Sequence, residues 1–223
     1  MVSRLPKWVL IAAFIMAFSA GIINVVGLIG FGRETVSHLT GNTSLLAEEI
    51  AKGSVSGALH YLLVILSFFA GAVVSGMIIR DSELLLGRRY SVVLVLIAIL
   101  LVSAVPLLDA QAQVGMYAAA AACGLQNAMV TTYSGATIRT AHLTGMFTDL
   151  GIFIGHRLRG LAVDARRIRI SLSVISGFLC GGIAGALLYS SMRNRAMYVP
   201  AGISLAAAAV YWWIRVRAAK SAA

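Results

Sequence analysis

Residues 38–45 read HLTGNTSL, and residues 142–149 read HLTGMFTD. Upstream of these two segments, residues 21–24 read GIIN and residues 124–127 read GLQN. The shared letters include polar residues, so the match is more than a coincidence of apolar sequence. The spacing indicates an internal duplication. Each half holds an apolar stretch, an HLTG segment, a glycine-rich stretch and a further apolar stretch.

The composition indicates a membrane protein. Of the 223 residues, 60% are hydrophobic and 12% are charged, and the mean hydropathy is +0.91. Soluble domains average about 45–50% apolar and 25% charged residues, which excludes a soluble enzyme or a DNA-binding domain. Cys123 and Cys180 both lie in apolar stretches, so neither a disulfide framework nor a metal cluster is expected. We expect no cofactor.

Hydropathy divides the chain into candidate membrane spans, each of which needs about 20 mainly apolar residues. Six stretches qualify: residues 8–31, 55–79, 90–108, 114–133, 170–190 and 196–213. Residues 35–50 and 140–154 are too polar or too short, and we expect half-helices or re-entrant segments there, with full crossings as the alternative. The predicted fold class is all-α: a polytopic membrane protein with about six transmembrane helices and two short HLTG segments.

Positive charge favours six crossings over eight, because cytoplasmic loops collect Lys and Arg. With six crossings, one side holds 14 of the 18 Lys and Arg residues, whereas eight crossings give 11 against 7. We therefore expect a multi-pass membrane protein with both termini in the cytoplasm. The arginine-rich residues 157–169 are expected to anchor to anionic lipid. Nucleic-acid binding is not expected, because no aromatic residues alternate with these arginines.

The number of crossings fixes how the two halves are related. Three crossings per half is an odd number, so residues 109–223 would enter the membrane from the side opposite to residues 1–108. The halves would form a 3+3 inverted repeat about an axis in the membrane plane, as in many transporters. Four crossings per half would make the two halves parallel.

The HLTG segments combine small polar residues with helix-forming residues, which is typical of a helix N-cap. Two such starts near the midplane would offer unpaired N–H groups and positive dipole ends to an anion or a small polar solute. Hydroxyl groups, two histidines and the intramembrane asparagines would supplement them. The candidate solute-binding residues are Asn24, His38, Thr40, Gly41, Asn42, Thr43, Asn127, His142, Thr144, Gly145, Thr148 and Asp149.

Structural roles compete with these functional ones. An intramembrane asparagine often bonds only to a neighbouring helix, and a Thr-Gly-Asn run can simply cap a helix. Asp149 would carry a proton or a cation, or would stabilise the first turn of a helix. Its counterpart in the first copy is Leu45, so the two copies are not identical.

These features favour a small-solute channel or secondary transporter. The alternative is a non-transporting scaffold or regulatory partner. Such a protein would use the small-residue pairs Gly71–Ser75 and Gly181–Gly185, which let helices approach closely inside one chain or in a homodimer. An enzyme is not expected, because the sequence has no His-Glu-x-x-His motif and no P-loop.

The GIIN segment at residues 21–24, HLTGN at 38–42 and the second HLTG at 142–145 resemble the YoaK family of small bacterial inner-membrane proteins. The likeness spans nearly the whole chain and implies a protein of roughly six spans. It implies no substrate. The second copy has Met146 where Asn42 stands in the first, which departs from the Thr-Gly-Asn element.

Overall fold

The computed structural model describes residues 8–31, 35–79, 88–134 and 140–221, and its regular structure in these ranges is helical. The elements are α1 (Trp8–Gly30), α2 (Leu39–Ala51), α3 (Val55–Ile78), α4 (Arg88–Asp109), α5 (Val114–Tyr133), α6 (Leu143–Leu158), α7 (Ala165–Met192), the short 3-10 helix η2 (Arg193–Met197) and α8 (Tyr198–Ser221). The predicted all-α class is confirmed.

Hydropathy located most helix ends to within a few residues, and the larger differences are at the end of α8, which extends to Ser221, and at the start of α7. This helix begins before the predicted stretch 170–190, because the Asp164 carboxylate caps it by accepting a hydrogen bond from the Arg166 backbone N–H at 2.9 Å. Apolar composition marks where a helix can cross a bilayer, whereas a cap marks where the helix begins.

Four stretches among the described residues are long and apolar enough to cross a bilayer: Trp8–Gly30, Val55–Ile78, Arg89–Asp109 and Ala165–Ile214. The last of these contains α7, η2 and most of α8. Helix α5 is outside this set and carries the polar residues Gln126 and Asn127. These stretches are typical of a helical membrane protein.

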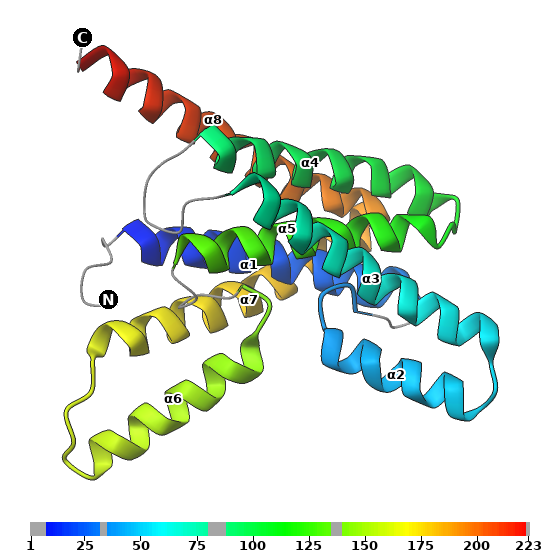
Figure 1. Cartoon of the computed structure of the whole chain (residues 1–223), viewed down its shortest axis with the longest axis horizontal. Helices are drawn as coiled ribbons and strands as arrows, with labels where there is room; N and C mark the ends of the chain where they lie inside the picture. The colour runs from blue at the N-terminus through cyan, green and yellow to red at the C-terminus, as the bar shows by residue number, and fades with distance from the viewer. Residues whose placement is uncertain (1–7, 32–34, 80–87, 135–139, 222–223) are drawn as a thin grey trace.

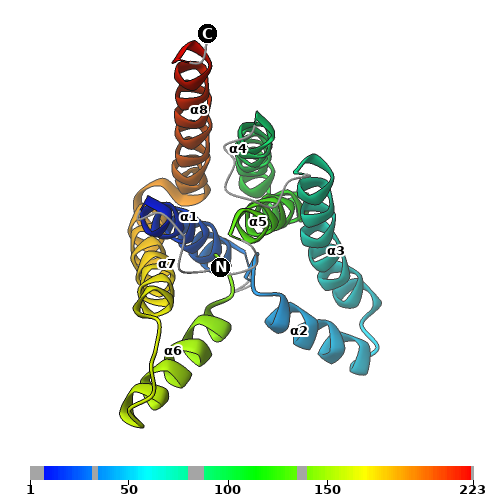
Figure 2. The same ribbon diagram turned by 60° about the vertical axis from the view of Figure 1, so that its left-hand side comes forward.

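The long helices α1, α3, α4, α5, α7 and α8 lie roughly along one common axis, and α1 begins at the same end of the bundle where α8 ends (Figure 1). The short helices α2 and α6 begin near the middle of the bundle and run towards opposite ends (Figure 1). Both splay away from the long helices (Figure 2). Among the described helices, α2 packs mainly on α3, and α6 packs on α7.

Two helix crossings use matching glycines. In the crossing of α1 and α7, a Cβ on Gly21 would meet the Phe178 carbonyl oxygen, and a Cβ on Gly181 would meet that of Phe18. In the crossing of α3 and α5, a Cβ on Gly124 would meet the Phe68 carbonyl oxygen, and a Cβ on Gly71 would meet that of Ala121. Such approach of backbone to backbone is possible only where no side chain intervenes. Each crossing therefore joins a helix that precedes one HLTG segment to a helix that follows the other HLTG segment.

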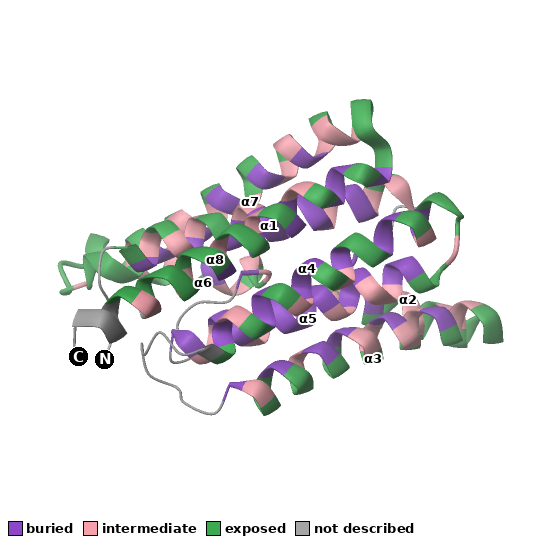
Figure 3. Ribbon diagram, turned by 90° about the horizontal axis from the view of Figure 1, so that it is seen from above, coloured by how far each residue is buried: buried purple, intermediate pink, exposed green. Residues whose placement is uncertain are grey.

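The packed interior lies around α1, α4 and α5, where buried residues are densest (Figure 3). Ile22 and Ile23 of α1, Ile97 and Leu101 of α4 and Met116 of α5 have no exposed surface. Large apolar side chains on the outer faces of α3 and α7, such as Phe69 and Leu179, are about 60% exposed (63% and 60%). An apolar exterior around a well-packed interior suits a protein surrounded by lipid.

Charged residues lie at the turn between α2 and α3. Lys52 Nζ lies 2.7 Å from the Glu48 carboxylate and 3.2 Å from the Glu49 carboxylate. Two hydrogen bonds lower the pKa of the Glu49 carboxyl: the bond with Ser54 has the larger effect, and the bond with Lys52 has the smaller one. Gly53 has a φ of +71°, which permits the sharp reversal. The outer end of α2 is therefore polar and held by local contacts.

Candidate functional site

The start of α2 is tied to the interior of α1. Asn24 Oδ1 accepts hydrogen bonds from the Ser37 hydroxyl at 3.0 Å and from the Ser37 backbone N–H at 3.4 Å. Asn42 is almost fully buried, and its side-chain amide donates to the Thr35 carbonyl at 3.0 Å. Asn24 lies six residues before the end of α1, so this junction is about 9 Å inside the helix end. Helix α2 therefore begins at depth and runs outward.

The start of α6 lacks these polar ties. Asn127 corresponds to Asn24, but its side-chain oxygen is buried and has no hydrogen-bond partner among the described residues. Ala141, at the place equivalent to Ser37, has no hydroxyl to donate. Met146 is buried where Asn42 is buried in the first copy. The two starts thus share a position in the fold but differ in chemistry.

The predicted N-caps are wrong in detail. Helix α2 begins at Leu39 and helix α6 at Leu143, so their N-caps are His38 and His142, neither of which makes a side-chain capping bond. The Thr-Gly-Asn run lies inside the first turn of α2 because the helix begins before it. The histidine rings pack on the glycines that follow: a Cβ on Gly41 would be 2.6 Å from His38 Nδ1, and one on Gly145 would meet the His142 ring.

Most of the predicted hydroxyl ligands face outward. Thr43 and Ser44 donate to the carbonyls of Leu39 and Thr40, at 2.8 and 3.1 Å, and Thr148 donates to the carbonyl of Thr144 at 2.9 Å. These are bonds to the preceding helical turn, which satisfy a hydroxyl locally. The exposed members of the predicted set are His38, Thr40, Thr43, His142, Thr144, Thr148 and Asp149. No extensive packing joins α2 and α6 in the described ranges, so a shared solute site remains a prediction.

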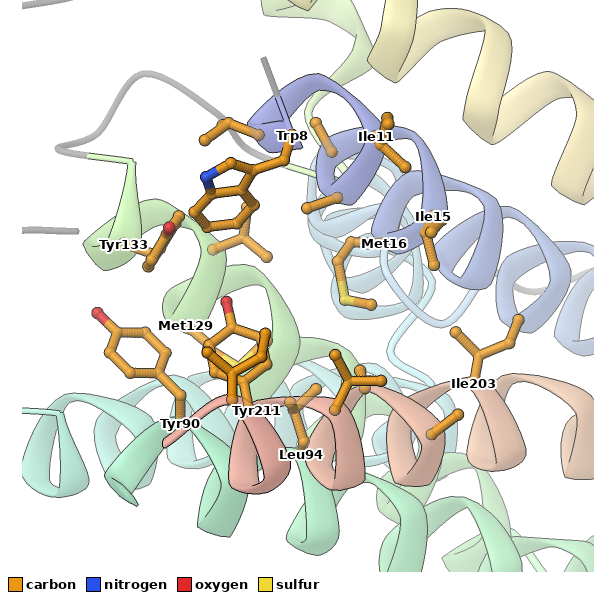
Figure 4. A pocket seen from close by; sticks show the side chains of 18 residues that line it. Trp8, Ile11, Ile15, Met16, Tyr90, Leu94, Met129, Tyr133, Ile203 and Tyr211 are labelled. Atoms are coloured by element: carbon orange, nitrogen blue, oxygen red, sulfur yellow. The ribbon is translucent and has the colours of Figure 1, made fainter. Parts of the chain in front are cut away.

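A cavity of about 620 Å³ lies elsewhere, between α1, α4, α5 and α8. Figure 4 shows Trp8, Tyr90, Tyr133 and Tyr211 gathered at one end and aliphatic side chains such as Ile203 towards the other. The ring centroids of Trp8 and Tyr133 are 5.7 Å apart, and those of Tyr90 and Tyr133 are 5.5 Å apart. The volume is within the usual range of small-molecule sites, roughly 300–1,000 Å³.

Polar side chains are buried beside this cavity. Met16 lines it, and the Met16 carbonyl accepts a hydrogen bond at 2.7 Å from the side-chain amide of Gln126, which is 2% exposed. The Gln126 side-chain oxygen and the Ser19 hydroxyl are buried without partners among the described residues. Unsatisfied buried polar atoms are costly, so they mark a candidate contact for water or solute. Sequence analysis missed Gln126, although this polar residue interrupts an apolar stretch beside Asn127.

At the opposite end of the bundle, η2 packs against α1, α4, α7 and α8. Asn194 is buried, and its side-chain amide donates to the Asp109 carboxylate at the end of α4 at 3.0 Å. A Cβ on Gly30, at the end of α1, would be 2.9 Å from Asn194 Oδ1. Asn194 therefore joins the ends of α1 and α4 through η2, on the side away from the aromatic residues of the cavity.

Basic residues are concentrated at the end where the aromatic residues lie. The exposed arginines that begin α4 and α7 or end α6 and α8 are Arg89, Arg157, Arg159, Arg166, Arg167, Arg169 and Arg217. At the other end the described basic residues are Lys52, Arg193 and Arg195. The Arg217 guanidinium lies 3.9 Å from the centroid of the Trp213 ring. The charge asymmetry that favoured six crossings is thus an asymmetry between the two ends of the bundle.

The long apolar helices are those of a helical membrane protein. The sequence profile described as "Protein of unknown function (DUF1275)" matches residues 12–210, and the chain belongs to that family. No curated protein and no solved structure matches the chain.

Proposed function

We propose that the chain is a small secondary transporter built from two inverted halves, residues 1–108 and 109–223. The two glycine crossings support this architecture, because Gly21 and Gly181 are used in one as Gly124 and Gly71 are used in the other. The short helices that start inside the bundle and leave in opposite directions support it as well (Figure 1). We also propose that, within its family, the chain is one of the YoaK proteins that its sequence motifs resemble.

In this architecture six long helices cross the membrane, and α2 and α6 are half-helices. The arginine-rich end would face the cytoplasm, because positive charge is retained there. Both termini would then be cytoplasmic, in a bacterial inner membrane, and the arginines would contact anionic lipid.

The observation that carries the transport proposal is the unequal packing of the fourth helix of each half. Helix α4 packs along α5, whereas its counterpart α8 makes few contacts with α1, and the cavity occupies the space between them. Two halves of equal architecture in unequal conformations are what alternating access requires. The present state would be open at the arginine-rich end and closed at η2.

The solute would pass from the cavity towards the buried polar atoms of Ser19 and Gln126 and then between the halves. The predicted contacts at Asn24, Asn42 and Asn127 lie on or beside the same central helices, α1 and α5. The exposed residues of α2 and α6, Asp149 included, would contribute only if these helices move inward.

The scaffold alternative finds less support. It needs glycine faces that a partner can reach, but Gly71 faces α5, and Gly181 and Gly185 face α1. These small residues already serve contacts inside the chain.

The test is to tie α8 to α1 across the cavity. Ala12 and Ala207 line opposite walls, and the exposed native thiol of Cys180 is first replaced by serine. Purified A12C/A207C protein in liposomes is joined with a reducible bifunctional thiosulfonate, and flux of a panel of organic and inorganic solutes is measured. We expect flux above empty vesicles, its loss on cross-linking and its recovery on reduction.

The two single-cysteine variants are the controls and should keep their flux after the same treatment. Absence of flux for every solute, or flux that persists in fully cross-linked protein, would contradict the proposal.

A further inference from the structure

We infer that the cavity binds a single-chain anionic amphiphile, namely a medium-chain carboxylate. This inference rests on the proposed function and names its substrate class. The walls are almost wholly apolar: the described lining residues are aliphatic, aromatic or methionine, and among them the only nitrogen and oxygen atoms on side chains are the Trp8 indole N–H and the hydroxyls of Tyr90, Tyr133 and Tyr211. A small inorganic ion would lose its hydration there without replacement. An alkyl chain would gain from burial.

The Tyr133 hydroxyl supplies a polar contact. Tyr133 is 8% exposed, and its phenolic oxygen is buried without a hydrogen-bond partner among the described residues. A buried tyrosine hydroxyl normally finds a partner. A carboxylate that enters the aromatic end of the cavity would accept a hydrogen bond from it, and such charge-assisted bonds are strong.

The charged residues near the cavity favour an anionic ligand over a cationic one. A tryptophan and three tyrosines could also surround an organic cation. However, no described residue that lines the cavity carries a carboxylate, and the exposed Arg89 precedes Tyr90 on α4 while the exposed Arg217 follows Ile214 on α8. These positive charges attract an anion and repel a cation. The carboxylate would therefore lie at this end, with its chain directed towards Ile203.

Trp8 allows a direct measurement of binding, because it lines the cavity while Trp212 and Trp213 lie on the exposed surface. In a W212F/W213F background Trp8 is the only tryptophan, and a bromine atom quenches its fluorescence at contact. The probes carry the bromine beside the head group, which this inference places near Trp8: 2-bromoundecanoate, 2-bromoundecan-1-ol and (2-bromoundecyl)trimethylammonium. We expect saturable quenching by the carboxylate, in detergent and in phosphatidylcholine vesicles, and affinities about tenfold weaker or worse for the other two.

Two pairs of variants separate the cavity from the lipid phase. Tyr133→Phe should weaken carboxylate binding about tenfold, the cost of one charge-assisted hydrogen bond, whereas Tyr198→Phe at the other end of α8 should not. Ala206→Phe fills the cavity and should abolish saturable quenching, whereas Ala209→Phe, on the same helix but outside the cavity, should not. Size-exclusion profiles confirm that each variant is folded.

Equal affinity for the three probes, or an unchanged affinity in Tyr133→Phe, would overturn the inference. Saturable quenching that appears in detergent and disappears in vesicles would assign the cavity to a phospholipid chain and would overturn it too. Carboxylate binding without any flux would reject transport and keep this inference. Flux of another solute without saturable quenching would support transport and overturn this inference.

Discussion

Asn194 donates a hydrogen bond from its side-chain amide to the Asp109 carboxylate at 3.0 Å, and this bond connects η2 to the end of α4. The two residues are 85 positions apart in the chain, and the bond fastens η2 to the last residue of α4, at the boundary between the two halves. It lies at the end of the bundle opposite the aromatic residues of the cavity. In a transporter open at the aromatic end, this contact would have to break when the other end opens.

Removing this bond should loosen the closed end. Asn194→Ala should raise amide hydrogen exchange in residues 193–197 roughly tenfold, because a hydrogen bond to a charged group contributes about 1.5–3 kcal/mol. Asp109→Asn keeps an acceptor oxygen and should change exchange much less. Identical protection in Asn194→Ala and the unmodified protein would show that the bond does not hold η2 in place.

The glycine crossings should tolerate no side chain. Gly71→Ala places a methyl group against the Ala121 carbonyl and should destabilise the protein by about 1–3 kcal/mol. Gly76, on the same helix, has open space at its Cβ, so Gly76→Ala should be neutral or slightly stabilising. Thermal unfolding in detergent compares the two variants. Equal melting temperatures would show that close packing at Gly71 does not stabilise the protein.

The two starts of the short helices should respond unequally to the loss of their asparagines. Asn24→Ala breaks two hydrogen bonds to Ser37 and should increase exchange throughout the first turns of α2. Asn127→Ala removes an oxygen that is buried and unpartnered among the described residues, and should leave exchange in α6 nearly unchanged. Equal effects would mean that the Ser37 bonds do not position α2.

A substitution of Gln126 should affect transport much more than stability. Gln126→Leu removes one hydrogen bond to Met16 and also a buried oxygen without a described partner, so the free energy of unfolding should change by less than about 1 kcal/mol. Flux in proteoliposomes should nevertheless fall severalfold, because the proposed path loses a polar contact. Full flux in this variant would place the path elsewhere.

Local sequence features predicted the helices well, because apolar length and glycine spacing report directly on membrane helices. They predicted the beginnings of α2 and α6 less well. The Thr-Gly-Asn residues form the first turn of a helix whose N-cap is His38, and small polar residues suit both positions. Sequence alone cannot distinguish a cap from a first turn when the preceding residue can also end the extended segment.

The cavity could not be predicted from the sequence, because it depends on how far α8 lies from α1. Tyr90, Tyr133 and Tyr211 are far apart along the chain, and each is near the end of an apolar stretch, where an interfacial tyrosine is ordinary. Only tertiary packing brings their rings together. Gln126 was visible in the sequence, but a single polar residue in a span usually indicates no more than a helix–helix hydrogen bond.

In the proposed transport cycle, α8 moves against α1. Spin labels at Ile11 and Val210, which are exposed residues on opposite walls of the cavity, report this separation directly. In lipid nanodiscs we expect two populations of the distance between the two labels, with the shorter one enriched when undecanoate is added. A single distance that neither undecanoate nor any other solute of the transport panel changes would contradict it.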